Sequence, residues 1–158
     1  MEDSFGALKK FIEEKLPERL AELSGKDTPL PPPSKIVFGV VDVSRSDAKC
    51  TCAILPGKTE EEEPTLTAGV TSNTLTVGFI HRGADYQTLL RQMVRTAKAF
   101  RVAVRSDWTL GGLVDKAELG GTEFYPDAGP TSGTCCISET EITVQVPEAN
   151  APELDPFD

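Results

Sequence analysis

Apolar residues recur every three or four positions over the first 23 residues, a spacing that places them along one side of an α-helix. This stripe consists of Phe5, Leu8, Phe11, Ile12, Leu16, Leu20 and Leu23. Ser4 is a suitable N-cap, and Gly25 stands where helices commonly end. Pro17 interrupts the pattern. Because proline removes a helical hydrogen bond and clashes with the preceding turn, we expect a kink or two short helices there.

The next part of the chain has the composition of β-strands. Residues 36–43 (IVFGVVDV) and 50–55 (CTCAIL) are rich in β-branched and apolar side chains, and the short polar turn between them predicts an antiparallel hairpin. Residues 73–81 alternate apolar and polar side chains and predict a further strand. The proline-rich residues 26–34 are expected to form a stiff connector, and residues 56–65 an acidic loop.

The second half of the chain repeats the order of helix and then strands. Asp85 is a natural N-cap for a helix reaching residue 105. The predicted buried side of this helix comprises Leu89, Leu90, Met93, Val94, Ala97 and Phe100. Strands are predicted over residues 114–125, with a break at the paired glycines 120 and 121, and over residues 134–146.

This order predicts an α+β fold: a mainly antiparallel sheet of four to six strands, with the N-terminal helix and one long central helix packed on it. Residues 1–146 are expected to form a single domain, in keeping with the chain length of 158 residues. Residues 147–158 carry three prolines and four acids, which predicts an extended acidic tail. No stretch approaches the length of about 20 apolar residues that spans a bilayer, and the N-terminus lacks the hydrophobic core of a signal peptide.

Charge is distributed unevenly along the chain. Sixteen Lys and Arg stand against 25 Asp and Glu, and the net charge of −9 argues against a broad DNA-binding surface. Residues 82–105 carry +5, which leaves −14 on the remainder. Helical spacing places four cations of this segment in one basic stripe: Arg91, Arg95, Lys98 and Arg105. The stripe has three interpretations, which are a solvated helix face, an interface with an acidic surface of another copy, and, least favoured, a nucleic-acid contact.

The chain shows little sign of catalytic or metal chemistry. Its four cysteines, Cys50, Cys52, Cys135 and Cys136, lack the spacing of zinc ligands and are interpreted as reduced, buried hydrophobic residues. His81 is the single histidine, and a position on the surface or at a strand end is favoured over a catalytic role. The chain has no nucleophile elbow and no phosphate-binding glycine loop, so we predict no cofactor, no metal and no enzymatic activity.

Four consecutive glutamates, Glu60, Glu61, Glu62 and Glu63, form the most acidic segment. They lack the alternating ligands and central glycine of a calcium-binding loop. A solvated loop is the favoured interpretation, and a docking or lumen loop of an assembly is the functional alternative.

Several segments together resemble a known family. The LPERL segment at residues 16–20 precedes the proline-rich connector and the strands, and the long helix carries Tyr86, Leu89, Leu90, Arg91 and Ala97. The DWTLGGLV stretch at residues 107–114 follows that helix and is the most specific piece. Over most of residues 5–146 this layout resembles the tail terminator proteins of long-tailed bacteriophages, also called tail completion or tail-to-head joining proteins, and the related minor tail and neck proteins. Residues 50–55 match only in pattern, and residues 60–63 and the tail have no expected counterpart.

The resemblance implies a structural virion protein at the junction of tail and neck, assembled in the host cytoplasm. Such proteins form a homo-hexameric ring that caps the head-proximal end of the tail tube, stops its polymerisation and joins tail to head. The implied partners are other copies of the chain, the major tail tube protein, and a head–tail connector or stopper protein, with double-stranded DNA passing through unbound. A neighbouring neck or head-completion connector is the alternative, followed by a small cytosolic enzyme and a nucleic-acid-binding module.

Overall fold

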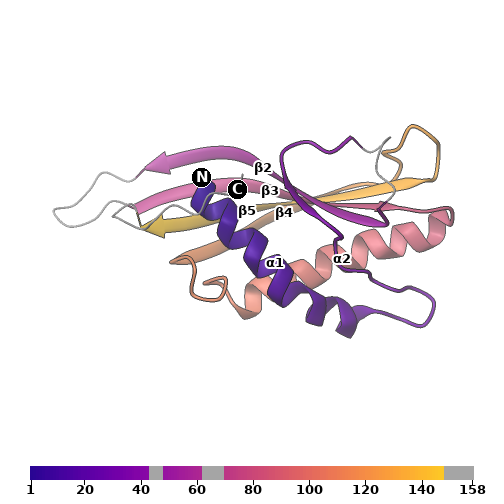
Figure 1. Cartoon of the computed structure of the whole chain (residues 1–158), viewed down its shortest axis with the longest axis horizontal. Helices are drawn as coiled ribbons and strands as arrows, with labels where there is room; N and C mark the ends of the chain where they lie inside the picture. Colours follow the sequence, from indigo (N-terminus) through magenta and orange to yellow (C-terminus); the bar gives the residue numbers. More distant parts are fainter. Residues whose placement is uncertain (43–47, 62–69, 148–158) are drawn as a thin grey trace.

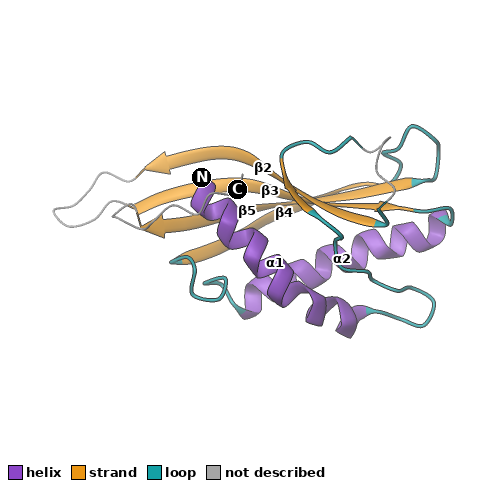
Figure 2. Cartoon of the chain, viewed as in Figure 1, coloured by secondary structure: helices purple, strands orange, loops and turns teal. Residues whose placement is uncertain are grey.

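The computed structural model describes residues 1–42, 48–61 and 70–147. These residues form two helices, α1 (Glu2–Leu23) and α2 (Tyr86–Ser106), and one five-stranded sheet. The strands are β1 (Ile36–Phe38), β2 (Cys50–Glu61), β3 (Val70–Arg82), β4 (Lys116–Tyr125) and β5 (Cys135–Pro147). They lie in the order β1-β2-β3-β5-β4, and both helices cover the same face of the sheet (Figure 1 and Figure 2). The predicted α+β class is confirmed.

The core lies between this sheet face and the two helices. On β3, alternate residues Leu75, Val77 and Phe79 are fully buried beneath the helices. The ring of Phe79 meets that of Phe100 from α2 edge to face, with the ring centroids 5.6 Å apart. α1 buries its apolar stripe in the same cluster. The sheet and α1 together therefore cover one face of α2 and leave its other face exposed.

The start of α1 differs from expectation, and of the two outcomes expected at Pro17 the division into two short helices is wrong. The helix begins at Glu2, with Met1 as its N-cap, and Ser4 is not a cap but a buried residue whose Oγ accepts a hydrogen bond of 2.9 Å from Asn73 Nδ2. The helix also continues through Pro17 as one element. Pro17 and Glu13 lie on the exposed side, where water can satisfy the carbonyl that proline leaves without its helical partner.

The predicted hairpin of residues 36–43 and 50–55 is wrong. β1 has only three residues and pairs with β2 in parallel. Gly39 has a φ of +131°, a conformation that residues with a Cβ rarely adopt, and the strand ends immediately before it. Val41 then packs against Ala53 and Ile80 on the sheet face away from the helices.

The predicted loop over residues 56–65 is also wrong in its first half, because β2 continues to Glu61. Opposite β3, the register shifts between Pro56 and Lys58, so a bulge takes up Gly57. Among the described residues, β1 pairs with β2 only as far as Ile54. Pro56 therefore lies where the outer edge of β2 has no strand beside it, a position that proline tolerates. The remainder of the loop lies outside the described residues, as does the tail beyond Pro147.

The later elements follow the sequence closely. Asp85 caps α2 as predicted, and its carboxylate accepts from the backbone N of Gln87 at 3.1 Å. β4 and β5 match the last two predicted strands within two residues at each end. The glycine pair of β4 coincides with a register shift between Leu119 and Thr122, which confirms the predicted break.

Candidate functional site

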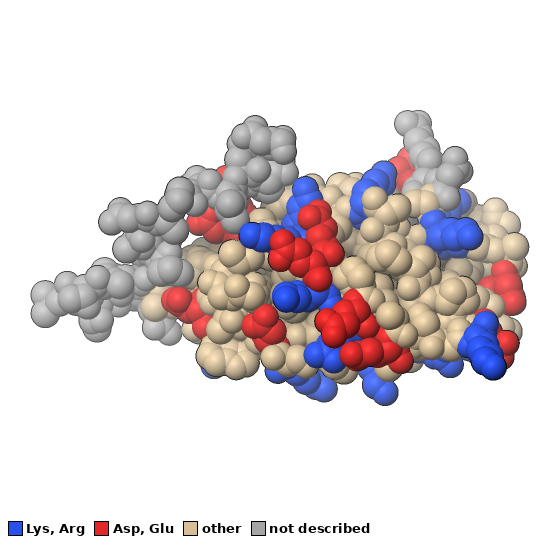
Figure 3. All heavy atoms as spheres, turned by 60° about the horizontal axis from the view of Figure 1, so that its bottom comes forward, with Lys and Arg blue, Asp and Glu red and all other residues tan. Residues whose placement is uncertain are grey.

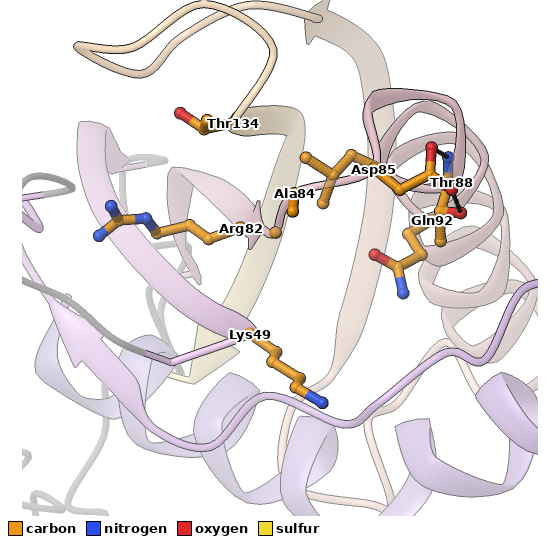
Figure 4. A pocket seen from close by; sticks show the side chains of 9 residues that line it. Lys49, Arg82, Ala84, Asp85, Thr88, Gln92 and Thr134 are labelled. Carbon is orange, nitrogen blue, oxygen red and sulfur yellow. Dashed lines mark hydrogen bonds between the residues drawn. The ribbon is translucent and has the colours of Figure 1, made fainter.

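One hollow in the described chain lies where β3 leads into α2. It measures about 560 Å³ and is open to solvent. Figure 4 shows the side chains of Lys49 and Gln92 reaching toward the same open space, while the guanidinium group of Arg82 extends away from Asp85. The hollow therefore brings together cationic and amide groups but no thiol or imidazole.

The one carboxylate of this hollow is already used by the helix. Asp85 accepts from Thr88 Oγ1 at 2.9 Å and from the first backbone N–H groups of α2. These hydrogen bonds lower the pKa of Asp85, which keeps it charged and makes it a poor general acid. Gln92 Nε2 donates to the carbonyl of Pro29 at 2.8 Å, which ties the proline-rich connector to α2. We interpret this hollow as a structural junction.

The residues with nucleophilic or basic chemistry lie inside the molecule. His81 is fully buried near the end of β3, so of the two predicted positions the strand end is confirmed and the surface is wrong. Cys50 and Cys136 occupy the register positions on either side of it in the sheet. His81 Nε2 lies 3.1 Å from Thr96 Oγ1 of α2, whereas no described group hydrogen bonds to Nδ1. Burial lowers the pKa of His81 to about 4.

The same burial makes the thiols unreactive. It raises the pKa of Cys50 to about 12 and that of Cys136 to about 11, so little thiolate forms near neutral pH. All four cysteines are free and buried. Among residues 1–42, 48–61 and 70–147, no group of His, Cys, Asp and Glu side chains is arranged to hold a metal ion.

The basic stripe lies on the outward face of α2. Arg91, Lys98 and Arg105 are exposed, and Arg95 is partly covered where its guanidinium group approaches Gly25. None of the four forms a salt bridge with a carboxylate of the described chain. Figure 3 views the helical side, where acids and bases interleave over the middle and mostly Lys and Arg follow the lower margin.

Apolar residues accompany these cations, which the sequence interpretation missed. Val94 was predicted to be buried, yet half of it is exposed, because the sheet and α1 cover a narrower part of α2 than the apolar pattern suggested. Arg101, three residues beyond Lys98, belongs to the same face and could have been found from helical spacing. Its Nη1 donates to the carbonyl of Gly120 at 2.7 Å, so it joins α2 to the bulge of β4.

The DWTLGGLV segment determines how α2 and β4 lie beside each other. The Asp107 carboxylate accepts from Thr109 Oγ1 at 3.0 Å and from Gly111 N at 2.9 Å. Leu110, Gly111 and Gly112 all have positive φ, a sequence of turns that glycine permits at the last two positions. Leu110 is buried, and the carbonyl of Trp108 accepts from Ala117 N at the start of β4. The motif is therefore a structural turn.

A groove between α2 and the edge strand β4 results from this arrangement. Two adjoining hollows of about 380 and 390 Å³ share Arg101 and Arg105. Apolar groups line it, and Trp108 and Phe124 are 55% and 44% exposed. We call this the α2–β4 groove, defined by Val94, Ala97, Lys98, Arg101, Val102, Val104, Arg105, Trp108, Ala117, Glu118, Leu119, Gly121, Thr122 and Phe124.

The acidic candidate lies at the other side of the sheet. Glu60 and Glu61 are exposed residues at the end of β2, and they belong to a strand, not to the loop that was predicted. Glu60 Oε1 pairs with Lys58 Nζ at 2.9 Å. Glu62 and Glu63 lie outside the described residues. The structure thus keeps the acidic and basic candidates apart, on β2 and on the helix beside β4.

No family model and no curated protein matches the chain. Within the described residues, neither helix combines the length and the apolar character that crossing a bilayer requires.

Proposed function

We propose that the chain is a structural protein of the tail–neck junction of a long-tailed bacteriophage. In this proposal several copies, six as the resemblance implies, form a ring on the head-proximal end of the tail tube. The ring stops tube polymerisation and binds the connector or stopper protein of the filled head.

One observation carries the proposal: each copy has two different exposed patches at opposite edges of its sheet. The α2–β4 groove presents cations and apolar side chains beside one edge strand, and the far half of β2 presents Glu60 and Glu61. A closed head-to-tail ring requires two unlike, complementary patches on each subunit. The surplus of cations on one face and of acids on the other supplies this complementarity.

The interior of the described chain supports a structural role over an enzymatic one. His81 and the cysteines are buried, and their shifted pKa values keep them uncharged near neutral pH. The net charge of −9 suits a channel through which DNA passes, since acidic walls repel phosphates.

The first test compares charge reversal on two helices. The stripe variant carries Arg91→Glu, Arg95→Glu and Lys98→Glu, and its matched control carries Lys9→Glu, Lys10→Glu and Lys15→Glu on the outer side of α1. Native mass and negative-stain images would be recorded across a concentration series, with and without purified tail tubes. We expect wild type and control to form closed rings on tube ends, and the stripe variant to lose them.

The outcomes separate the candidates. Binding to isolated heads and not to tubes would assign the chain to the neighbouring neck position. A wild-type protein that forms no ring, alone or on tubes, would overturn the proposal. Rings formed equally well by the stripe variant would remove the stripe from the interface.

A further inference from the structure

The α2–β4 groove combines exposed apolar side chains with cations. Val94, Trp108 and Phe124 are each between 44% and 55% exposed, although large apolar side chains are usually covered. Three cations, Lys98, Arg101 and Arg105, line the groove against one acid, Glu118, whose carboxylate pairs with Lys116. Neither Lys98 nor Arg105 forms a salt bridge within the described chain. An occupant that fits this groove must therefore be anionic and also carry apolar side chains.

The described chain ends close to the groove. Gln145, two residues before the end of β5, pairs with Lys116 at the start of β4, and its carbonyl accepts from Asp115 N at 3.0 Å. Asp115 belongs to the connection that leads from Trp108 into β4. Figure 1 shows the end of β5 on the same side of the molecule as the connection from α2 to β4. The described chain thus ends at Pro147, next to the Trp108 end of the groove.

The length of this segment suits the groove. Eleven residues follow Pro147, and at roughly 3.3 Å per residue they span up to about 36 Å. The groove follows β4 from Ala117 to Phe124, which is roughly 25 Å at the rise of a strand. The segment can therefore turn at the Trp108 end and still reach Phe124.

The sequence of the segment, EANAPELDPFD, complements the groove. It contains four acids and no Lys or Arg, and its apolar side chains are Leu154 and Phe157. Two prolines, Pro152 and Pro156, favour an extended conformation, which lowers the entropy lost on binding.

We propose that residues 148–158 bind in the α2–β4 groove of their own chain, with their carboxylates beside Lys98 and Arg105 and with Leu154 and Phe157 over its apolar side chains. A short tether gives the segment an effective concentration of about 1 mM, so a weak contact suffices to fill the groove. The inference does not depend on the ring. If the ring forms as proposed, the segment and the acidic surface of the next copy compete for the same cations.

The single tryptophan provides the readout. Trp108 lies in the groove, and the chain contains no other tryptophan. Its quenching by acrylamide, which is uncharged, would be measured in the full chain. The tail variant carries Glu153→Gln, Asp155→Asn and Asp158→Asn. Its matched control carries Glu13→Gln, Glu14→Gln and Glu18→Gln on the exposed side of α1, the same change of charge away from the groove.

We expect the tail variant, and separately Phe157→Ala, to raise the quenching constant of Trp108 above that of wild type, because they uncover the indole ring. The control variant should match wild type. Exchanging the charges, with Asp155→Lys and Asp158→Lys beside Lys98→Glu and Arg105→Glu, should restore the protection that either half alone removes.

Two results would overturn the inference. Equal quenching in wild type, tail variant and control would show that the segment does not cover Trp108. A protection that depends on protein concentration would show that another copy is the occupant. Neither result bears on whether rings form on tail tubes, so a failure here is distinguishable from a failure of the proposed function.

Discussion

Lowering the pH from 7 toward 4 should destabilise this protein through His81. In the folded chain His81 is buried, and its pKa is lowered from 6.5 to about 4. The neutral imidazole is therefore the form that the fold accepts. The resulting stability is fully present above pH 6.5 and is lost as the pH falls toward 4, because the unfolded chain takes up the proton first.

The size of the effect follows from the difference between the two pKa values. Each unit corresponds to about 1.4 kcal/mol, so the free energy of unfolding should fall by roughly 3 kcal/mol in total, with about 2 kcal/mol of that lost by pH 5. This is a large share of the roughly 5–15 kcal/mol that stabilises a typical domain.

The assay compares wild type with the double variant His81→Leu and Thr96→Val, which removes the imidazole and the hydroxyl that hydrogen bonds to it. Urea unfolding of both proteins would be followed between pH 7 and pH 4.5. The two proteins contain the same carboxylates, so the difference between their curves isolates His81. Since the chain has one histidine, NMR can also read the titration directly. Parallel pH curves, or a resonance that titrates near 6.5, would refute the reasoning.

Three further changes test the fold that presents the groove. Asp85→Ala should destabilise the protein by about 1 kcal/mol in urea unfolding, because the N-cap hydrogen bonds are lost, while Asp85→Asn should retain most of them. Phe100→Ala should cost roughly 3–5 kcal/mol by the same measurement, since the ring is fully buried, and a smaller loss would mean that the core closes over the cavity. Gly57→Ala should lower the melting temperature, because the new Cβ would lie 2.8 Å from the backbone oxygen of Thr74, whereas Gly121→Ala meets open space and should change it little; equal shifts in the two would contradict the bulge geometry.

Local signals in the sequence predicted much of the fold. The spacing from Leu89 to Phe100 and the cap at Asp85 defined α2, and alternation from Ile142 to Val146 defined β5. These features depend on residues that lie close together in the sequence, so the local pattern of the sequence is enough to predict them. Glycines 120 and 121 likewise marked the bulge of β4.

Features that depend on distant partners were not predicted. The parallel pairing of β1 with β2 joins segments that lie more than ten residues apart, and no local pattern encodes it. The strand character of Glu60 and Glu61 comes from pairing with β3, which overrides the preference of glutamates for a solvated loop. The division of the first helix at Pro17 was expected because the exposed position of this proline could not be known from the sequence.

One part of the candidate surface was predicted from the sequence and the other part was not. Helical spacing identified the stripe of Arg91, Arg95, Lys98 and Arg105, because that face belongs to one element. The groove beside it requires β4, which the sequence separates from α2 by the turn at residues 107–114. Only the folded chain brings Phe124 and Trp108 beside these cations, so the apolar half of the surface was invisible to pattern analysis.

The two sheet edges bear on how copies could associate. In the order β2-β3-β5-β4, three inter-strand steps of about 4.8 Å separate β2 from β4. The acidic patch on β2 and the α2–β4 groove are therefore roughly 14 Å apart across the sheet. Each edge is interrupted by a bulge, between Pro56 and Lys58 on β2 and between Leu119 and Thr122 on β4. Such interruptions oppose continuous backbone pairing between copies, which would otherwise extend the sheet without limit. Contacts through side chains are left as the means of association, and these permit the angle between neighbours that closes a ring.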